Sequence, residues 1–222
     1  MVSSPDSAAA PCVVDTMVLA MFVDADQVPL LSALAGGPIF VPPTIIDPEE
    51  IPPFGQQPTA EFAKGAFYLQ QRLGRPLDAV RFQRRVAFYL DVNSRWRLVE
   101  LSHAELRRTD ELMDPTTWRQ AGATDPSIRV KKIGRGEAEC AAVAIARGWT
   151  LWSDDAAIVN LLAALHPGHP VERISDLLAR AVREGLIACD TAADLYNTIF
   201  KETLGLWTRL ALHCRDGQLV AQ

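Results

Sequence analysis

Acidic residues stand where strands and helices of this chain are expected to end or begin. Asp15 follows a short apolar run, Glu137 opens an alanine-rich stretch, and Asp154 and Asp155 follow a second apolar run. In an open parallel sheet the carboxyl ends of the strands meet at one edge, so acids remote in sequence can approach each other there. Gathered carboxylates repel one another unless a cation lies between them, and oxygen ligands select Mg²⁺ or Mn²⁺. The acids therefore predict a catalytic metal site that cleaves phosphodiester bonds.

Two of the predicted acids also have an ordinary structural explanation. Asp15 is a residue type that often caps a helix, and Glu137 lies in a first helical turn, where the helix dipole favours negative charge. We favour the interpretation of both acids as metal ligands, because further acids are found at other predicted strand ends and helix starts. Glu139 lies about 200° around the helix from Glu137, so both cannot readily bind one ion. We expect Glu137 to be the metal ligand. Glu139 is expected either to contact the ligands without binding the metal or to lie in solvent.

The adjacent pair Asp154 and Asp155 ends a predicted strand. Alternation along the strand points the two side chains in opposite directions, so one can cap the next helix while the other faces the site. We predict Asp155 as the first choice of ligand and catalytic residue, and Asp154 as the second.

A fourth ligand is expected after the second strand, where acids follow a proline-rich turn. Asp47 is ranked first and Glu50 second, while Glu49 remains an alternative. The competing interpretation of Asp47 is a helix N-cap, because Pro48 would then occupy the first helical position. The sequence does not decide which of these acids turns inward.

Hydroxyl and basic side chains near the acids have predicted supporting roles. Thr16 and Ser153 are placed to orient a ligand carboxylate or a metal-bound water, although both also suit helix capping. A basic group just before Glu137 is predicted to hold substrate phosphates, with a solvated loop as the alternative. This group comprises Arg129, Lys131, Lys132 and Arg135.

Short β-rich runs alternate with helical ones, which predicts an α/β fold with a mostly parallel sheet. Helices are expected between the strands, first at Thr16–Val23 and Val28–Leu34. The stretch from Asp114 to Lys132 is predicted to be a long loop over the site. The predicted strands are Cys12–Val14, Pro38–Val41, Arg97–Leu101, Thr150–Ser153 and Pro170–Arg173.

Two helical additions are predicted outside this alternating core. An insertion at about 52–94 carries helices at about Ala60–Leu73 and Leu77–Leu90, where apolar residues recur near the helical period. Its Arg81, Arg84 and Arg85 are predicted to form a solvated basic face. A C-terminal tail at about 174–210 is expected to be helical at Ile174–Glu184 and Thr191–Leu210.

Composition limits the class of protein. A chain of 222 residues that is 49% apolar can bury one core, so we expect a single domain over 1–222. No apolar run approaches the roughly 20 residues that span a bilayer, which predicts a soluble protein with no membrane partner. The net charge of −5 argues against a general polyanion-binding protein. Four scattered cysteines predict reduced thiols and a cytoplasmic location.

The combination of motifs resembles the PIN-domain nucleases. The matching motifs are Asp15-Thr16, Val41-Pro42-Pro43 followed by acids, Gly136-Glu137-Ala138-Glu139 and Ser153-Asp154-Asp155. The run 177–187 resembles the tail of the VapC-type toxin branch. The resemblance implies a PIN-like three-layer fold and metal-dependent cleavage of RNA. Together with the acids and the basic group before Glu137, it predicts endonucleolytic cleavage of single-stranded RNA with Mg²⁺ or Mn²⁺. It puts Asp15, Glu137 and Asp155 on the acidic positions of the family.

Other functions remain as alternatives to a nuclease. The chain could instead be a non-catalytic PIN-like interaction module. Within the nuclease interpretation it could be a toxin bound by an antitoxin-type protein, or a homodimer, because the tail carries many apolar residues. A haloacid-dehalogenase-like phosphatase needs an Asp two residues after its nucleophile, and Met17 occupies that position.

Overall fold

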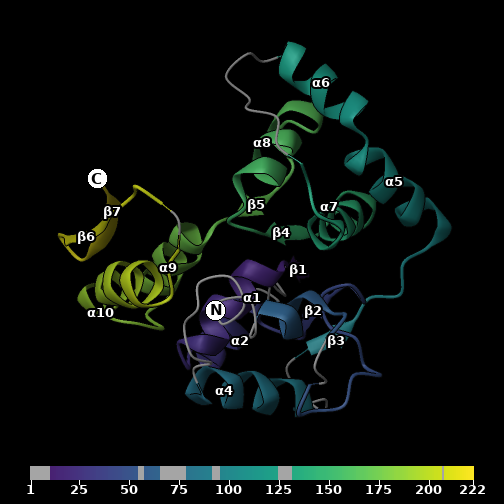
Figure 1. Cartoon of the computed structure of the whole chain (residues 1–222). Coiled ribbons are helices and arrows are strands. Elements are labelled where there is room, and N and C mark those ends of the chain that lie inside the picture. The colour runs from purple at the N-terminus through teal and green to yellow at the C-terminus, as the bar shows by residue number, and fades with distance from the viewer. Residues whose placement is uncertain (1–10, 55–57, 66–78, 92–95, 125–131, 207) are drawn as a thin grey trace, which may run out of the picture.

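Five parallel strands form the central sheet, in the order β3-β2-β1-β4-β5 (Figure 1). The computed structural model describes residues 11–54, 58–65, 79–91, 96–124, 132–206 and 208–222. The strands are β1 (Cys12–Val14), β2 (Ile39–Val41), β3 (Trp96–Leu98), β4 (Thr150–Trp152) and β5 (Val171–Glu172). The predicted α/β fold and its parallel sheet are confirmed.

The central strand β1 lies between β2 and β4. Val13 pairs with Phe40 on one side and with Leu151 on the other. Val13 and Val14 are fully buried, as expected for a parallel strand that is covered on both faces. The strand order reverses direction between β1 and β4, and such a switch point is where open α/β sheets place their binding sites.

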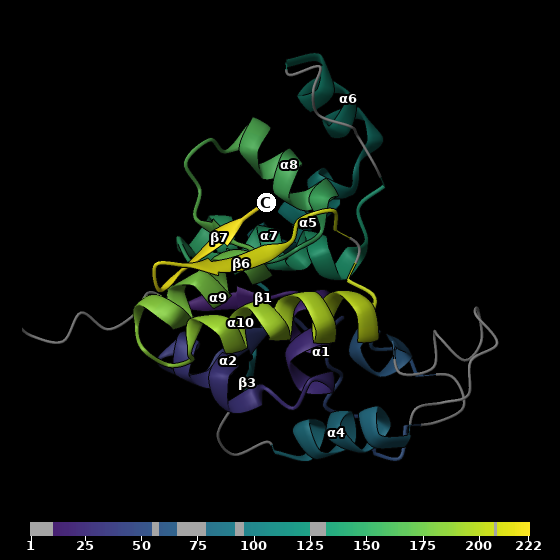
Figure 2. The ribbon, with the colours of Figure 1, turned by 90° about the vertical axis from the view of Figure 1, so that its left-hand side faces the viewer.

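Helices cover both faces of the sheet and complete three layers (Figures 1 and 2). One side carries α1 (Thr16–Asp24), α2 (Val28–Ala35) and α4 (Ala79–Leu90). The other side carries α5 (His103–Met113), α6 (Pro115–Thr124), α7 (Arg135–Arg147) and α8 (Ala156–Leu165).

The predicted loop from Asp114 to Lys132 is wrong over its first half, which forms α6. Pro115 is the first residue of this helix, where its missing N–H costs nothing. Asp114 accepts a hydrogen bond from the backbone N–H of Thr116 at 2.7 Å and so caps the helix. Residues 125–131 lie outside the described part of the chain.

The predicted insertion contains two described helical segments. One begins at Glu61 and is described over 61–65, and the other is α4. Residues 66–78, which include the rest of the first predicted helix, are not described. Arg85 of α4 joins these segments to α1: its guanidinium binds both carboxylate oxygens of Asp24 at 2.7 Å and the carbonyl of Phe62 at 2.8 Å.

This contact corrects the predicted basic face of α4. Arg85 is buried against Asp24 rather than solvated. Arg84 donates to the carbonyl of Asp24, and Arg81 donates to the carbonyl of Thr203. The three arginines therefore attach α4 to the rest of the protein.

The C-terminal tail is partly helical, as predicted, but ends in a hairpin that was not. It contains α9 (Ile174–Arg183), α10 (Cys189–Asp194) and the π-helix η1 (Leu195–Thr203). The helix predicted to reach Leu210 stops because Gly205 adopts a left-handed conformation, with φ 78°.

An antiparallel hairpin follows, formed by β6 (Leu212–Arg215) and β7 (Gln218–Ala221), and it lies along α9 and α10 (Figure 2). Asp216 and Gly217 both have positive φ, as a two-residue hairpin turn requires.

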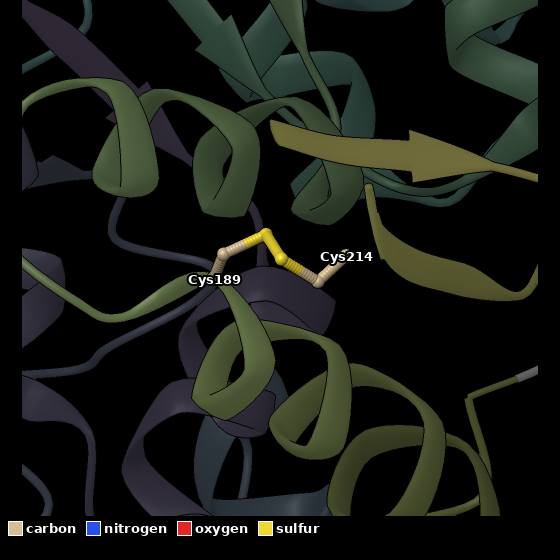
Figure 3. Close-up of a disulfide and its surroundings, with 2 residues drawn as sticks. All are labelled: Cys189 and Cys214. Atoms are coloured by element: carbon tan, nitrogen blue, oxygen red, sulfur yellow. A yellow bond between two sulfur atoms is a disulfide. The ribbon is translucent and has the colours of Figure 1, made fainter. Parts of the chain in front are cut away.

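A disulfide joins Cys189, at the start of α10, to Cys214 in β6 (Figure 3). The expectation of four reduced thiols is therefore wrong for these two residues, which are 25 positions apart in sequence. Cys12 and Cys140 are free and buried, as predicted. The argument for a cytoplasmic location rested on reduced thiols and loses its basis.

The apolar tail residues that suggested a homodimer or antitoxin interface belong mostly to the core. Leu177, Leu178 and Ala181 are fully buried within this chain, whereas Leu186 is 42% exposed. The tail therefore gives little support to a protein partner. Among the described residues, no helix is both long and apolar enough to cross a membrane.

Candidate functional site

Asp15 lies at the switch point between β1 and β4 and begins α1. Its Oδ1 accepts a hydrogen bond from the backbone N–H of Val18 at 2.9 Å, and its Oδ2 accepts one from the Ser153 hydroxyl. The residue is only 1% exposed. Burial raises the pKa of Asp15 to about 7, and the charges of Glu137 and Asp154 contribute to the increase. A nearby cation would stabilise its charged form.

Glu61 is a site residue that the sequence did not single out. Its Oε2 accepts a hydrogen bond from the Thr16 hydroxyl at 2.8 Å, and its Oε1 accepts one from the backbone N–H of Gly136 at 3.2 Å. A Cβ at Gly136 would clash with this carboxylate, so the close approach requires glycine there. Because Thr16 follows Asp15 and Gly136 precedes Glu137, Glu61 links the two predicted ligands.

Glu137 lies in the first turn of α7, as predicted. Its Oε2 accepts a hydrogen bond from the backbone N–H of Gly134 at 2.5 Å, which caps the helix. Burial raises the pKa of Glu137, and the negative charges of Asp155 and Glu61 raise it further. The charges of these three acids therefore act on one another.

Asp155 and Asp154 turn in different directions, as the strand pattern predicted. Asp155 caps α8 through the backbone N–H of Ala157 at 2.6 Å, and its own N–H donates to the Ser153 hydroxyl at 3.2 Å. Asp154 instead accepts a hydrogen bond from Arg173 Nε at 2.7 Å. Asp154 is thus paired with Arg173, although its charge still acts on Asp15. Asp155 is the acid whose charge acts on Glu137.

The predicted supporting hydroxyls both contact acids of the site. Ser153 donates to Asp15 and accepts from the backbone of Asp155, so it joins the ends of β1 and β4. Thr16 donates to Glu61. Both side chains therefore donate hydrogen bonds to carboxylates at this edge of the sheet, and their role beside a metal ion stays a prediction.

Asp47 does not lie among these acids, contrary to the prediction. Its Oδ1 accepts a hydrogen bond from the backbone N–H of Glu49 at 2.9 Å, and its charge, like that of Glu50, acts on Tyr89. Asp47 begins a turn and not a helix, so the N-cap interpretation is also wrong. Glu61, 14 positions later in the chain, takes the place expected of Asp47.

Glu139 is buried, so the solvated alternative of the two that were expected for it is wrong. It is 4% exposed and its Oε1 accepts a hydrogen bond from Arg135 Nε at 2.9 Å. Arg135 is thus engaged by an acid, although it was predicted to hold phosphate. Lys132 is exposed beside the start of α7, while Arg129 and Lys131 lie outside the described residues.

The four central acids belong to four helix N-termini. Asp15 caps α1, Glu61 opens its own helix, Glu137 lies in the first turn of α7 and Asp155 caps α8. The positive end of each helix dipole stabilises the negative charge beside it. This arrangement lets several acids gather at one edge of the sheet. We call these four residues the acid cluster.

The acid cluster has the donor chemistry of a Mg²⁺ or Mn²⁺ site, since all its ligands would be carboxylate oxygens. Burial raises the pKa values of Asp15 and Glu137 and neighbouring acids add to the increase, so a bound cation would lower both pKa values. Across the described residues, no three His, Cys, Asp or Glu side chains are arranged to hold a metal ion. The carboxylates bind protein N–H and O–H groups, which a cation would have to replace in part.

Comparison with known protein families, with curated proteins and with solved structures finds no match to this chain. The fold and the acid cluster therefore define a class only: a three-layer α/β protein with carboxylates gathered at its switch point.

Proposed function

We propose that this chain is a Mg²⁺- or Mn²⁺-dependent endoribonuclease that cleaves single-stranded RNA. The observation that carries the proposal is the acid cluster at the switch point, whose members act on one another's charges. The acids alone would suit the cleavage of DNA and of RNA equally well. The motif resemblance to PIN-domain nucleases is what favours RNA as the substrate. A toxin-like role in a toxin–antitoxin pair belongs to the same proposal.

In the proposed reaction the acids bind the metal, and neighbouring side chains keep the acids oriented. Asp15, Glu61, Glu137 and Asp155 would bind one or two ions, which when bound activate a water and neutralise charge on the phosphate. Ser153 and Thr16 keep Asp15 and Glu61 oriented by hydrogen bonds. Arg173 holds Asp154 away from this role.

Substrate access favours a flexible strand. The acids lie at the carboxyl ends of β1 and β4, where loops and helix starts surround them. A single strand can bend down to these residues, whereas a duplex would have to bring its rigid backbone to the strand ends. Of the predicted phosphate-binding residues that the structure describes, Lys132 is exposed just before α7, whereas Arg135 is bonded to Glu139.

The test is cleavage of matched, labelled RNA and DNA oligonucleotides, single-stranded and duplex, with Mg²⁺, Mn²⁺ or a chelator. We expect internal cuts in single-stranded RNA that require the metal. Asp15→Asn should lower the rate at least about a hundredfold, which corresponds to about 3 kcal/mol of transition-state stabilisation. The exposed control Glu49→Gln should cleave like the wild type.

Two outcomes would contradict the proposal. Cleavage that persists in Asp15→Asn would assign the activity to a contaminating nuclease. Absence of cleavage of every RNA with either metal would favour the alternative of a non-catalytic interaction module.

A further inference from the structure

Glu50 makes three hydrogen bonds to the segment that leads into Glu61. Its Oε1 accepts from the backbone N–H of Thr59, from the Thr59 hydroxyl at 2.7 Å and from the backbone N–H of Ala60 at 3.0 Å. The helix that carries Glu61 starts directly after these residues. The positive end of the helix dipole also stabilises a carboxylate at this position.

The first two N–H groups of the helix are bound as well. Glu61 donates its backbone N–H to the carbonyl of Thr44 at 2.9 Å, and Phe62 donates to the carbonyl of Ile45 at 3.1 Å. Helix starts leave such donors without partners inside the helix. Glu50 accepts from the two N–H groups just before the helix, and the turn after β2 accepts from the first two N–H groups of the helix, so the helix start is held from both sides.

We propose that Glu50 is a positioning residue for the acid cluster. By binding Thr59 and Ala60, Glu50 fixes the backbone at the start of the helix. This places the Glu61 side chain where it contacts Thr16 and Gly136. Glu50 makes none of the contacts to Thr16 and Gly136, which belong to Glu61, and its charge acts on Tyr89. For its effect on metal binding, this inference rests on the proposed function. For the position of Glu61, it rests on geometry alone.

The position of Glu61 can be read without metal, from the amide of Gly136. This N–H donates to Glu61 Oε1 from another element, 75 positions away in sequence. In ¹⁵N–¹H NMR spectra of the metal-free protein, Glu50→Ala should move the Gly136 amide signal in the same direction as Glu61→Gln does. Glu49→Ala, which alters the exposed neighbour of Glu50, should leave the Gly136 signal in place.

Glu50→Gln tests the same inference with a smaller change. Its amide oxygen still accepts hydrogen bonds, although more weakly than a carboxylate. The Gly136 signal should therefore shift in the same direction as in Glu50→Ala, but less. This variant keeps the test decisive if Glu50→Ala does not fold. A Gly136 signal at its wild-type position, while the signals of Thr59 and Ala60 move, would overturn the inference.

Metal binding provides the second readout. Residues that support metal ligands typically change affinity 10- to 100-fold when replaced. We expect Glu50→Ala to weaken Mn²⁺ binding at least about tenfold in the wild-type background and not at all in Glu61→Gln. An equal loss in both backgrounds would indicate a general structural role and overturn the inference. A wild type that does not bind Mn²⁺ would contradict the proposed function, while the Gly136 signal would still decide the role of Glu50.

Discussion

Asp15 combines two roles that sequence reasoning treated as alternatives. It caps α1 through Val18, and it is a buried carboxyl whose pKa is raised to about 7. Glu137 shows the same combination at α7, where it caps the helix and burial raises its pKa. Asp155 caps α8 beside it. Helix capping and membership of the site are therefore compatible, because a helix N-terminus stabilises an acid that burial and its neighbours destabilise.

The raised pKa of Asp15 makes the stability of the metal-free protein depend on pH. Between about pH 4 and pH 7 the folded protein keeps a proton on Asp15 that the unfolded chain, with an ordinary pKa of 3.8, has released. Stability therefore falls as the pH rises through this window, by up to roughly 4 kcal/mol from this group. The loss is complete above the folded pKa.

Urea unfolding at a series of pH values, with a chelator present, measures this effect. Asp15→Asn cannot ionise, so its stability should decline less between pH 4 and pH 7 than that of the wild type. Parallel curves for the two proteins would show that Asp15 does not titrate in this range.

At the scale of elements, the strands were predictable and some helix starts were not. The central strands β1, β2 and β4 are short, mostly apolar runs, and all five strands were located from the sequence. Glu61 was missed because it follows a proline-rich segment and opens a helix far from the end of β2. A pattern search near Val41 could find only Asp47 and its neighbours.

Two further elements, α6 and the C-terminal hairpin, begin or turn at residues with clear local signals. Asp114-Pro115 is a helix start, and Asp216-Gly217 is a two-residue hairpin turn. The Cys189–Cys214 pairing depends on how the hairpin lies against α10. Spacing alone could not reveal it.

The buried ion pair between Arg85 and Asp24 attaches α4 to α1 and to the helix of Glu61. Both side chains are less than 10% exposed, at 8% and 7%. Arg85→Ala leaves the Asp24 charge buried and uncompensated, so we expect a loss of roughly 3–5 kcal/mol in the free energy of unfolding. Arg84→Ala, at the more exposed neighbouring position, should cost about 1 kcal/mol.

Urea unfolding of the two variants separates these expectations. Equal losses in Arg85→Ala and Arg84→Ala would mean that the buried pair does not hold α4 in place. A large loss in Arg85→Ala alone would confirm that the insertion is part of the folded core.

At the scale of the whole molecule, the topology explains why distant acids meet. The strand order reverses between β1 and β4, so the segments after these two strands face each other. The helix at 61–65 is docked on the turn after β2 and brings Glu61 between α1 and α7. The sequence predicted three of the four acids because they adjoin strand ends or helix starts with clear patterns. The fourth required the packing of the insertion.

The central claim is that these four acids share a cation, and calorimetric titration with Mn²⁺ tests it most directly. Wild type should bind Mn²⁺, and at about a hundred times its dissociation constant the ion should add roughly 2.7 kcal/mol of stability. Glu61→Gln should lose most of this binding, whereas Asp47→Asn should bind like the wild type, because Asp47 lies outside the cluster. Equal Mn²⁺ binding by wild type and Glu61→Gln, or a loss confined to Asp47→Asn, would contradict the account.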